Sequence, residues 1–230
     1  MEEDVRKFVL YSDQNHPKNN IVDAKLLSLI QKPSPRVGYI PSCADKTRKY
    51  FYENCKYYRK LGFEDFLYFD LDDEYEALKI NELLSCDIVH LSAGDPIYFN
   101  HNIKRRNFVG VLQDFVDKGG ILVGVSGGSL QLTKTVAIYK SFIGNLDDIT
   151  HEDIMGLSAL NLVDFEFLPH YNRWNQDFIK AVKAYSAKFS SLIYACKDGD
   201  GIVVNDNKIE FVGNIVKIEN GIVMTPEESF

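Results

Sequence analysis

One stretch decides the fold of this 230-residue chain: Gly119-Gly120-Ile121-Leu122-Val123-Gly124-Val125-Ser126-Gly127-Gly128-Ser129-Leu130-Gln131-Leu132. Its first half predicts a buried strand, because apolar and mainly β-branched residues follow a Gly-Gly break. The pattern Gly124-x-Ser126-x-Gly128 then puts a serine on a sharp turn from strand to helix, where small residues let the two elements approach closely. The turn would expose the hydroxyl beside free backbone N–H groups at the start of the helix. This is typical of a nucleophilic serine, although a plain glycine-rich turn or a phosphate-binding loop would show the same pattern.

Upstream of this stretch, expected strands alternate with expected helices. Alternation of this kind predicts βαβ units and therefore an α/β fold, a doubly wound, mostly parallel sheet with helices on both faces. Ligands of such sheets bind at the carboxyl ends of the strands, where both Ser126 and the loop around Gly94 are expected. The expected strands are 7–11, 37–41, 66–69, 87–91 and 121–125, and the expected helices are 21–30, 45–61, 73–84 and 103–118.

The last hundred residues change in character, because short strands separated by Asp-Gly and Asn-Gly turns replace the long alternation. These turns predict antiparallel hairpins that close one side of the sheet. The apolar strand that precedes His170 is expected to lie beside the other strands. We find no repeat and no linker, so one domain is predicted over residues 1–230. The expected elements are strands 162–168, 192–196, 202–204, 208–212 and 215–218 and a helix over 174–187.

Composition excludes several classes of function. The net charge is −7, from 33 acidic and 26 basic residues, and no run of five or more Lys or Arg occurs, which disfavours nucleic acid as a partner. No apolar run approaches the roughly 20 residues that span a bilayer, and the acidic N-terminus does not resemble a signal peptide, so no membrane partner is expected. The cysteines lack metal-binding spacing, which favours free thiols and a cytoplasmic location. They are Cys43, Cys55, Cys86 and Cys196.

A serine nucleophile needs a base, and histidine is the usual one. Among the five histidines, His170 follows an apolar strand, so its ring is expected at the same edge of the sheet as Ser126. The alternative for His170 is a histidine that caps a loop at the end of a strand. His90 lies within an expected strand and is better explained as a core residue, whereas His151 lies in a polar loop.

Four motifs occur in a characteristic order: Leu91-Ser92-Ala93-Gly94-Asp95-Pro96, Gly124-Val125-Ser126-Gly127-Gly128-Ser129, Phe167-Leu168-Pro169-His170-Tyr171, and Cys196-Lys197-Asp198-Gly199-Asp200-Gly201-Ile202-Val203-Val204. Together they resemble the dipeptidase E and cyanophycinase family of serine peptidases, which has a class I glutamine-amidotransferase-like fold. The resemblance extends from about residue 36 to about residue 205.

The resemblance implies a role for each matching residue. It implies that Ser126 is the nucleophile, His170 the base and Asp198 the acid that orients the base, with the backbone N–H groups of Gly94 and Gly127 as the oxyanion hole. Two departures stand out. The family commonly has alanine after the serine, where this chain has Gly127, and its glycine loop usually has two or three consecutive glycines, where this chain has Ser-Ala-Gly-Asp.

The sequence leaves alternatives open at several points. Glu166 lies four residues before His170 on the same strand face and is the next candidate for the orienting acid, followed by Asp164 and the Asp147/Asp148 pair. Arg173 is expected either to pair with a substrate carboxylate or to be a solvated arginine at the start of a helix.

The function predicted from these residues is a serine peptidase that hydrolyses small peptides as a dipeptidase or exopeptidase, with no metal and no cofactor. A non-peptidase acyl hydrolase or amidohydrolase on the same fold, and a catalytically inactive binding module, are the alternatives. The sequence also leaves a homodimer open.

Overall fold

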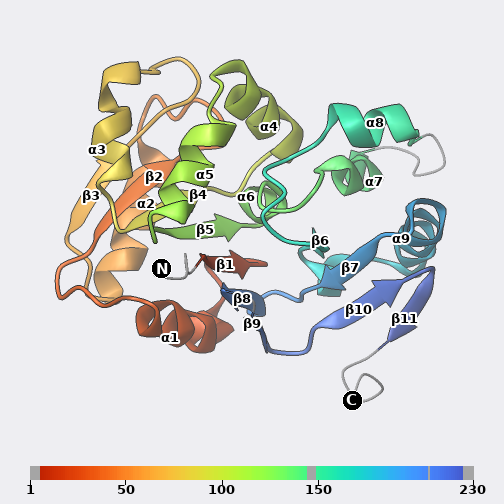
Figure 1. The fold of residues 1–230 in the computed structure, drawn as a ribbon. Coiled ribbons are helices and arrows are strands. Elements are labelled where there is room, and N and C mark those ends of the chain that lie inside the picture. Colours follow the sequence, from red (N-terminus) through yellow and green to blue (C-terminus); the bar gives the residue numbers. More distant parts are fainter. Residues whose placement is uncertain (1–5, 144–148, 207, 225–230) are drawn as a thin grey trace.

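The computed structural model describes residues 6–143, 149–206 and 208–224 and contains two sheets (Figure 1). The larger sheet has the strand order β3-β2-β4-β5-β1-β8-β9. Its first five strands are all parallel, and β8 and β9 join antiparallel at one edge. The prediction of a mostly parallel α/β sheet is therefore confirmed. The strands are β1 (Lys7–Tyr11), β2 (Arg36–Ile40), β3 (Asp65–Tyr68), β4 (Ile88–Leu91), β5 (Ile121–Val125), β8 (Gly201–Asn205) and β9 (Lys208–Val212).

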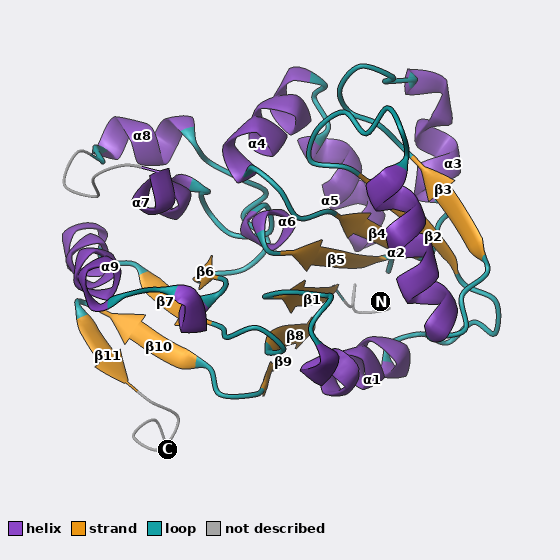
Figure 2. Ribbon diagram, turned by 180° about the vertical axis from the view of Figure 1, so that it is seen from behind, coloured by secondary structure: helices purple, strands orange, loops and turns teal. Residues whose placement is uncertain are grey.

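Helices cover both faces of the larger sheet (Figures 1 and 2). One face carries α1 (Asn20–Ser28) and α2 (Lys49–Lys60), whose buried residues pack on alternate residues of the strands, such as Val9 and Val123. The opposite face, with Phe8 in its core, carries α3 (Ile80–Leu84), α4 (Pro96–Arg105) and α5 (Val109–Asp117). The alternation of faces along each strand follows from the two-residue period of a pleated strand.

The second sheet has the order β11-β10-β7-β6 and packs against α9 (Gln176–Phe189). The sequence did not lead us to expect it. The prediction that the strand before His170 lies beside the strands of the larger sheet is wrong, because β6 pairs with β7 in the second sheet. Of the predicted hairpins, β8–β9 extends the larger sheet and β10–β11 belongs to the second one. The strands are β6 (Glu166–Leu168), β7 (Leu192–Ala195), β10 (Val216–Glu219) and β11 (Ile222–Met224).

Two predicted helices are shorter than the periodicity suggested. The single helix expected over 103–118 is instead α4 and α5, separated at Asn107, whose φ is +53°. The helix expected over 73–84 is reduced to a 3₁₀ turn, η2 (Ala77–Lys79), and α3. There, the Asp70 carboxylate accepts the N–H groups of Asp72 and Glu74 and holds the chain in a turn that competes with a helix.

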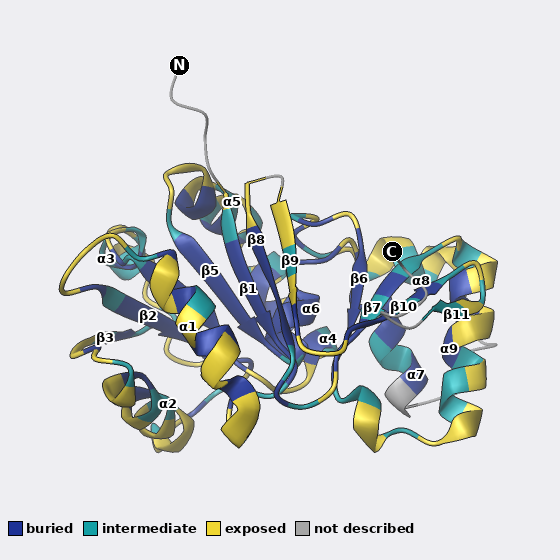
Figure 3. Ribbon diagram, turned by 90° about the horizontal axis from the view of Figure 1, so that it is seen from below, coloured by how far each residue is buried: buried dark blue, intermediate teal, exposed yellow. Residues whose placement is uncertain are grey.

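The remaining short elements are η1 (Pro17–Asn19), α6 (Gly127–Leu130), η3 (Ala137–Tyr139), α7 (Lys140–Ile143), α8 (His151–Gly156) and η5 (Tyr171–Arg173). Figure 3 shows the inner strands buried between helices whose outer faces are exposed, whereas the edge strand β9 is largely exposed. In the described ranges, no helix combines the length and apolar character that crossing a bilayer requires. The four cysteines are free thiols, and of these only Cys43 is exposed.

Candidate active site

Ser126 follows β5 directly and has φ +50° and ψ −110°, a backbone conformation that a residue with a side chain rarely adopts. Its N–H donates to the Tyr11 carbonyl at 2.9 Å, and the Ser129 hydroxyl donates to the same carbonyl at 3.0 Å. The strained turn is therefore held against the neighbouring strand β1. The structure contains the predicted strand, sharp turn and helix in this order, and the helix is α6.

Gly127 and Gly94 lie in contact beside this turn. A Cβ atom on Gly127 would stand 2.1 Å from the Gly94 carbonyl oxygen, far inside van der Waals contact. Gly94 itself has φ +141°, and a Cβ there would stand 2.0 Å from the Ser42 hydroxyl oxygen. The loop before α4 thus approaches the serine turn more closely than an alanine after Ser126 would permit. This close approach gives a physical reason for the departure from the alanine that the family commonly has at this position.

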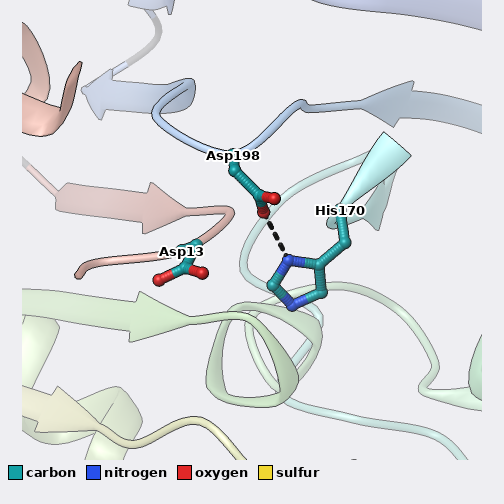
Figure 4. A group of neighbouring side chains, drawn as sticks. All are labelled: Asp13, His170 and Asp198. Atoms are coloured by element: carbon teal, nitrogen blue, oxygen red, sulfur yellow. Dashed lines mark hydrogen bonds and ion pairs between the residues drawn. The ribbon is translucent and has the colours of Figure 1, made fainter. Parts of the chain in front are cut away.

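A continuous chain of hydrogen bonds runs from Ser126 through His170 to Asp198. Ser126 Oγ lies 2.9 Å from His170 Nε2. On the other side of the ring, His170 Nδ1 lies 2.6 Å from Asp198 Oδ1 (Figure 4). His170 adopts the left-handed conformation, and its N–H donates at 2.8 Å to the buried Ser12 hydroxyl, which in turn donates to the Cys196 carbonyl. The imidazole is therefore fixed through its backbone as well as through its ring.

Asp198 is held on its other oxygen by two donors. Asp198 Oδ2 accepts Arg173 Nε at 2.7 Å and Asn172 Nδ2 at 3.0 Å, and the Asp198 N–H donates back to Asn172 Oδ1 at 2.8 Å. Burial by itself raises the pKa of this carboxyl group. The hydrogen bonds from Arg173, His170 and Asn172 outweigh burial, so the pKa of Asp198 lies below its ordinary value and the group is ionised at neutral pH.

Arg173 bridges two carboxylates, because its Nη2 also donates to Asp13 Oδ2 at 2.6 Å. About half of its side chain remains exposed, at the wall of the cavity described below. The guanidinium is thus half-exposed and ion-paired with two carboxylates of the protein. The prediction that Arg173 pairs with a substrate carboxylate stays a prediction.

The alternative acids lie elsewhere. Glu166 is buried in β6, where its Oε2 accepts the Tyr185 hydroxyl at 2.9 Å, and burial raises its pKa to about 7. The exposed Asp164 lies 3.7 Å from Lys134 Nζ. Asp147 and Asp148 lie outside the described residues. Of the candidates that the structure describes, Asp198 is the one that hydrogen-bonds to His170.

His90 lies within a strand, as the sequence suggested, whereas His151 lies on the surface but in helix α8 and not in the expected loop. His90 is buried in β4, and burial lowers its pKa to about 3, so the ring is neutral. His90 Nδ1 lies 3.1 Å from the Tyr58 hydroxyl. His151 is exposed at the first turn of α8.

Asp13, His170 and Asp198 are the residues here that could hold a metal ion, since one donor atom from each lies within 4.8 Å of the others (Figure 4). The Arg173 guanidinium already bridges the two carboxylates, at 2.6 Å from Asp13 and 2.7 Å from Asp198. It therefore supplies the positive charge that a metal ion would bring to these groups.

Ser126, His170 and Gly94 stand between two cavities. The larger, of about 520 Å³, extends over the ends of β1, β2 and β4 and is walled by polar and aromatic side chains. The smaller, of about 110 Å³, is mainly apolar and is closed by Pro96, Leu130, Tyr139, Pro169 and Trp174. Ser126 therefore adjoins space on two sides, which can hold the groups on either side of a scissile bond.

Sequence reasoning did not find Ser12, Asp13 or Asn172, which hold His170, Arg173 and Asp198 in place. A signal was present for the first two, because both follow β1 at the carboxyl edge of the sheet, as Ser126 follows β5. Asn172 lies two residues after His170, but nothing in the sequence alone indicates that its amide faces Asp198.

This chain is similar to known peptidases in sequence and in fold. The model of peptidase family S51 matches residues 8–212. The uncharacterized peptidase Lin0382 of Listeria innocua is 26% identical over 192 residues, which cover 80% of this chain and 85% of that protein.

Two solved structures have a similar fold. A peptidase from an acI-B1 Actinobacterium has a TM-score of 0.72 at 15% identity, covering 96% of this chain and 93% of that one. A protein of Listeria monocytogenes EGD-e, to which the name Peptidase E has been provisionally given, has a TM-score of 0.67 at 21% identity, covering 90% of this chain and 98% of that one.

Proposed function

This chain belongs to peptidase family S51 and is a serine-type peptidase, and we propose that it hydrolyses small peptides as an exopeptidase, with Ser126 as nucleophile, His170 as base and Asp198 as the orienting acid. The observation that carries the proposal is the continuous hydrogen-bond chain through these three side chains, with distances of 2.9 and 2.6 Å.

Each group has a defined task in this mechanism. Asp198, ionised and hydrogen-bonded to His170 Nδ1, keeps the proton on that nitrogen and leaves Nε2 free to accept the Ser126 proton. Ser126 Oγ then attacks the peptide carbonyl, and the imidazolium gives the proton to the leaving amine. In the second half of the reaction a water molecule attacks the acyl-enzyme. His170 takes a proton from this water and then gives a proton to the leaving Ser126 oxygen. Arg173 and Asn172 act as positioning residues, since each binds the Asp198 oxygen that faces away from His170.

The oxyanion of the tetrahedral intermediate needs donors that are fixed before the reaction. We assign this task to the backbone N–H groups of Gly94 and Gly127. Their contact across the serine turn supports the assignment, because it fixes both peptide units close to Ser126.

The preference for small peptides is supported by the size of the substrate space. A cavity of about 520 Å³ is in the range of roughly 300–1,000 Å³ that suits small ligands, and the adjoining cavity of about 110 Å³ adds room for little more than one small side chain.

The nucleophile is tested with a fluorophosphonate probe and the variant Ser126→Ala. We expect the probe to modify Ser126 in the unaltered protein. The variant should keep its unfolding temperature and lose kcat by about 10⁴-fold or more. The matched control is Ser28→Ala on the exposed surface of α1, which should keep both labelling and turnover. Labelling of another serine, or turnover by the Ser126 variant, would contradict the assignment.

The exopeptidase character needs a separate measurement. Hydrolysis of a dipeptide and tripeptide library, followed by mass spectrometry, is compared with hydrolysis of an unfolded protein under the same conditions. We expect cleavage in the library and no internal cleavage of the protein. Internal cleavage of the unfolded protein would contradict the exopeptidase proposal and leave the nucleophile assignment intact.

A further inference from the structure

We propose that Ser42 is a positioning residue for the oxyanion hole, and that its hydroxyl fixes the peptide unit whose N–H group serves as the donor at Gly94. This inference rests on the proposed function, since it explains how one of the two assigned oxyanion donors is held in place.

The Ser42 hydroxyl ties the loop at Gly94 to a neighbouring strand. Ser42 follows β2 at the carboxyl edge of the larger sheet, and β2 pairs with β4, which leads into this loop. Ser42 Oγ donates to the Ala93 carbonyl at 2.9 Å, although the two residues are 51 positions apart in the chain. Ser42 is 6% exposed, so water competes little for this hydrogen bond.

The carbonyl that Ser42 binds and the proposed donor belong to one peptide unit. A single peptide bond joins the Ala93 carbonyl to the Gly94 N–H, and no cis peptide bond occurs among the residues described. In a planar trans unit the C=O and N–H bonds point in opposite directions. A hydroxyl that fixes the carbonyl on one side therefore fixes the direction of the N–H group on the other.

The Gly94 N–H group is available to a substrate. It has no hydrogen-bond acceptor in the described ranges of the chain, and Gly94 lines both cavities that adjoin Ser126. A hydrogen bond to the carbonyl also polarises the peptide unit, which makes its N–H group a stronger donor. Ser42 thus both orients and strengthens the donor.

A second hydroxyl binds the same carbonyl but cannot replace Ser42. Ser92 Oγ donates to the Ala93 carbonyl at 3.1 Å, and it accepts the Ser42 N–H at 2.8 Å. Because Ser92 immediately precedes Ala93 in the chain, its hydroxyl moves with the loop. The bond from Ser42 is the one that joins this carbonyl to a different strand.

The packing at this contact requires a glycine. A Cβ atom on Gly94 would stand 2.0 Å from Ser42 Oγ and 2.9 Å from Ser42 Cβ. The Ser42 hydroxyl can therefore reach the loop only because Gly94 has no side chain, whereas Ala93 beside it carries one. The contact gives a physical reason for the glycine at this position of the Ser-Ala-Gly-Asp loop.

The rate at which a fluorophosphonate labels Ser126 tests the inference, because the phosphoryl oxygen of the probe occupies the oxyanion hole during this reaction. Ser42→Ala removes the hydroxyl. We expect its second-order rate constant of labelling to fall by about tenfold, less than the 10²–10³-fold that loss of a whole donor causes. For a dipeptide that the unaltered protein cleaves, kcat should fall by the same factor with little change in KM. Ser42→Thr keeps a hydroxyl and should restore most of the labelling rate.

Two controls separate positioning from a general loss of structure. Ser186→Ala also removes a buried hydroxyl that donates to a backbone carbonyl, that of Ser191 at 2.7 Å, but Ser186 lies in α9 beside the second sheet. Its labelling rate should equal that of the unaltered protein. The pH dependence of labelling reports the ionisation of His170, and its midpoint should not move in Ser42→Ala, since the hydroxyl binds the loop and not the imidazole.

An unchanged labelling rate in Ser42→Ala, an equal loss in Ser42→Thr, or a shifted pH midpoint in Ser42→Ala would overturn the inference. Each of these outcomes leaves the proposed function intact, because Ser126 of the unaltered protein is still labelled. If the probe does not label Ser126 in the unaltered protein, the nucleophile assignment and this inference are overturned together.

Discussion

The two halves of the candidate site are held together by different forces. The half that carries Ser126 is built at the carboxyl edge of the larger sheet, where β5, α6 and the loop at Gly94 meet through glycine backbones in close contact. The half that carries His170 and Asp198 lies on the segments that follow β6 and β7 of the second sheet, at the place where the two sheets approach (Figure 1). There the side chains are held by hydrogen bonds and ion pairs from Asn172 and Arg173.

This difference predicts how each half fails. A packed backbone contact is sensitive to added volume and indifferent to charge. A network of partly buried charges is sensitive to the loss of a single charge and tolerant of changes that conserve it. Substitutions that alter only volume, or only charge, therefore distinguish the two halves.

The largest expected effect is on the half that carries His170 and Asp198, which we call the charged half. Asp198→Asn keeps the volume but removes the charge that holds the tautomer of His170, and we expect kcat to fall by about 10³–10⁴-fold with little change in KM. The matched variant is Glu166→Gln, which changes the other acid near His170 in sequence. Because Glu166 hydrogen-bonds to Tyr185, kcat of this variant should stay near that of the unaltered protein. Steady-state kinetics on one dipeptide measures both, and the reverse result would make Glu166 the orienting acid.

A smaller effect is expected on the half that carries Ser126, which we call the packed half. Gly127→Ala adds one methyl group 2.1 Å from the Gly94 carbonyl oxygen, so the loop at Gly94 must move away. Displacing one oxyanion donor should lower kcat by about 10²–10³-fold. Gly110→Ala is the control, since a Cβ there meets nothing within 4 Å and α5 should gain up to about 1 kcal/mol of stability. Unchanged kcat in Gly127→Ala would show that the contact does not position the donor.

Much of the packed half could be predicted from the sequence. The alternation of strands and helices indicated the parallel sheet, and the rule that ligands bind at carboxyl ends of strands led to Ser126 and Gly94. These signals are local, because a strand, a turn and a short helix follow each other along the chain. His170 was expected as the base from its place after an apolar strand, and the family resemblance contributed Asp198 and the oxyanion groups. The family itself is confirmed by the match over residues 8–212.

The charged half could be predicted only in part. Periodicity shows that residues 162–168 form a strand but does not show which sheet the strand joins, so β6 was expected in the wrong sheet. The contacts of Asp198 with Arg173, and of Arg173 with Asp13, join residues 25 and 160 positions apart in the chain. No spacing rule reports such contacts, because loops that are far apart in sequence meet only after both sheets have formed.

The smallest expected effect concerns pH and the second sheet. Glu166 is buried in β6, and its pKa is raised to about 7 from an ordinary value of 4.5. Between these two pH values the folded protein holds a proton that the unfolded chain has lost. Stability from this group is therefore fully present below about pH 4.5 and is lost as the pH rises through about 7. The shift corresponds to a loss on the order of 3 kcal/mol above pH 7.

Glu166→Gln removes the titration and conserves an acceptor for the Tyr185 hydroxyl. The free energy of unfolding of this variant, taken relative to that of the unaltered protein, should therefore increase by roughly that amount from pH 5 to pH 8. Urea unfolding of both proteins at both pH values measures this change. All other titrating groups are common to the two proteins and cancel in the difference. Hydrogen exchange locates the effect: at pH 8 the unaltered protein should lose protection in β6 and β7 while β5 keeps it, because the carboxylate becomes charged inside the second sheet. An equal loss of protection in β5 would mean that the packed half and the charged half unfold together. The two halves would then differ in how their side chains are held but not in their stability.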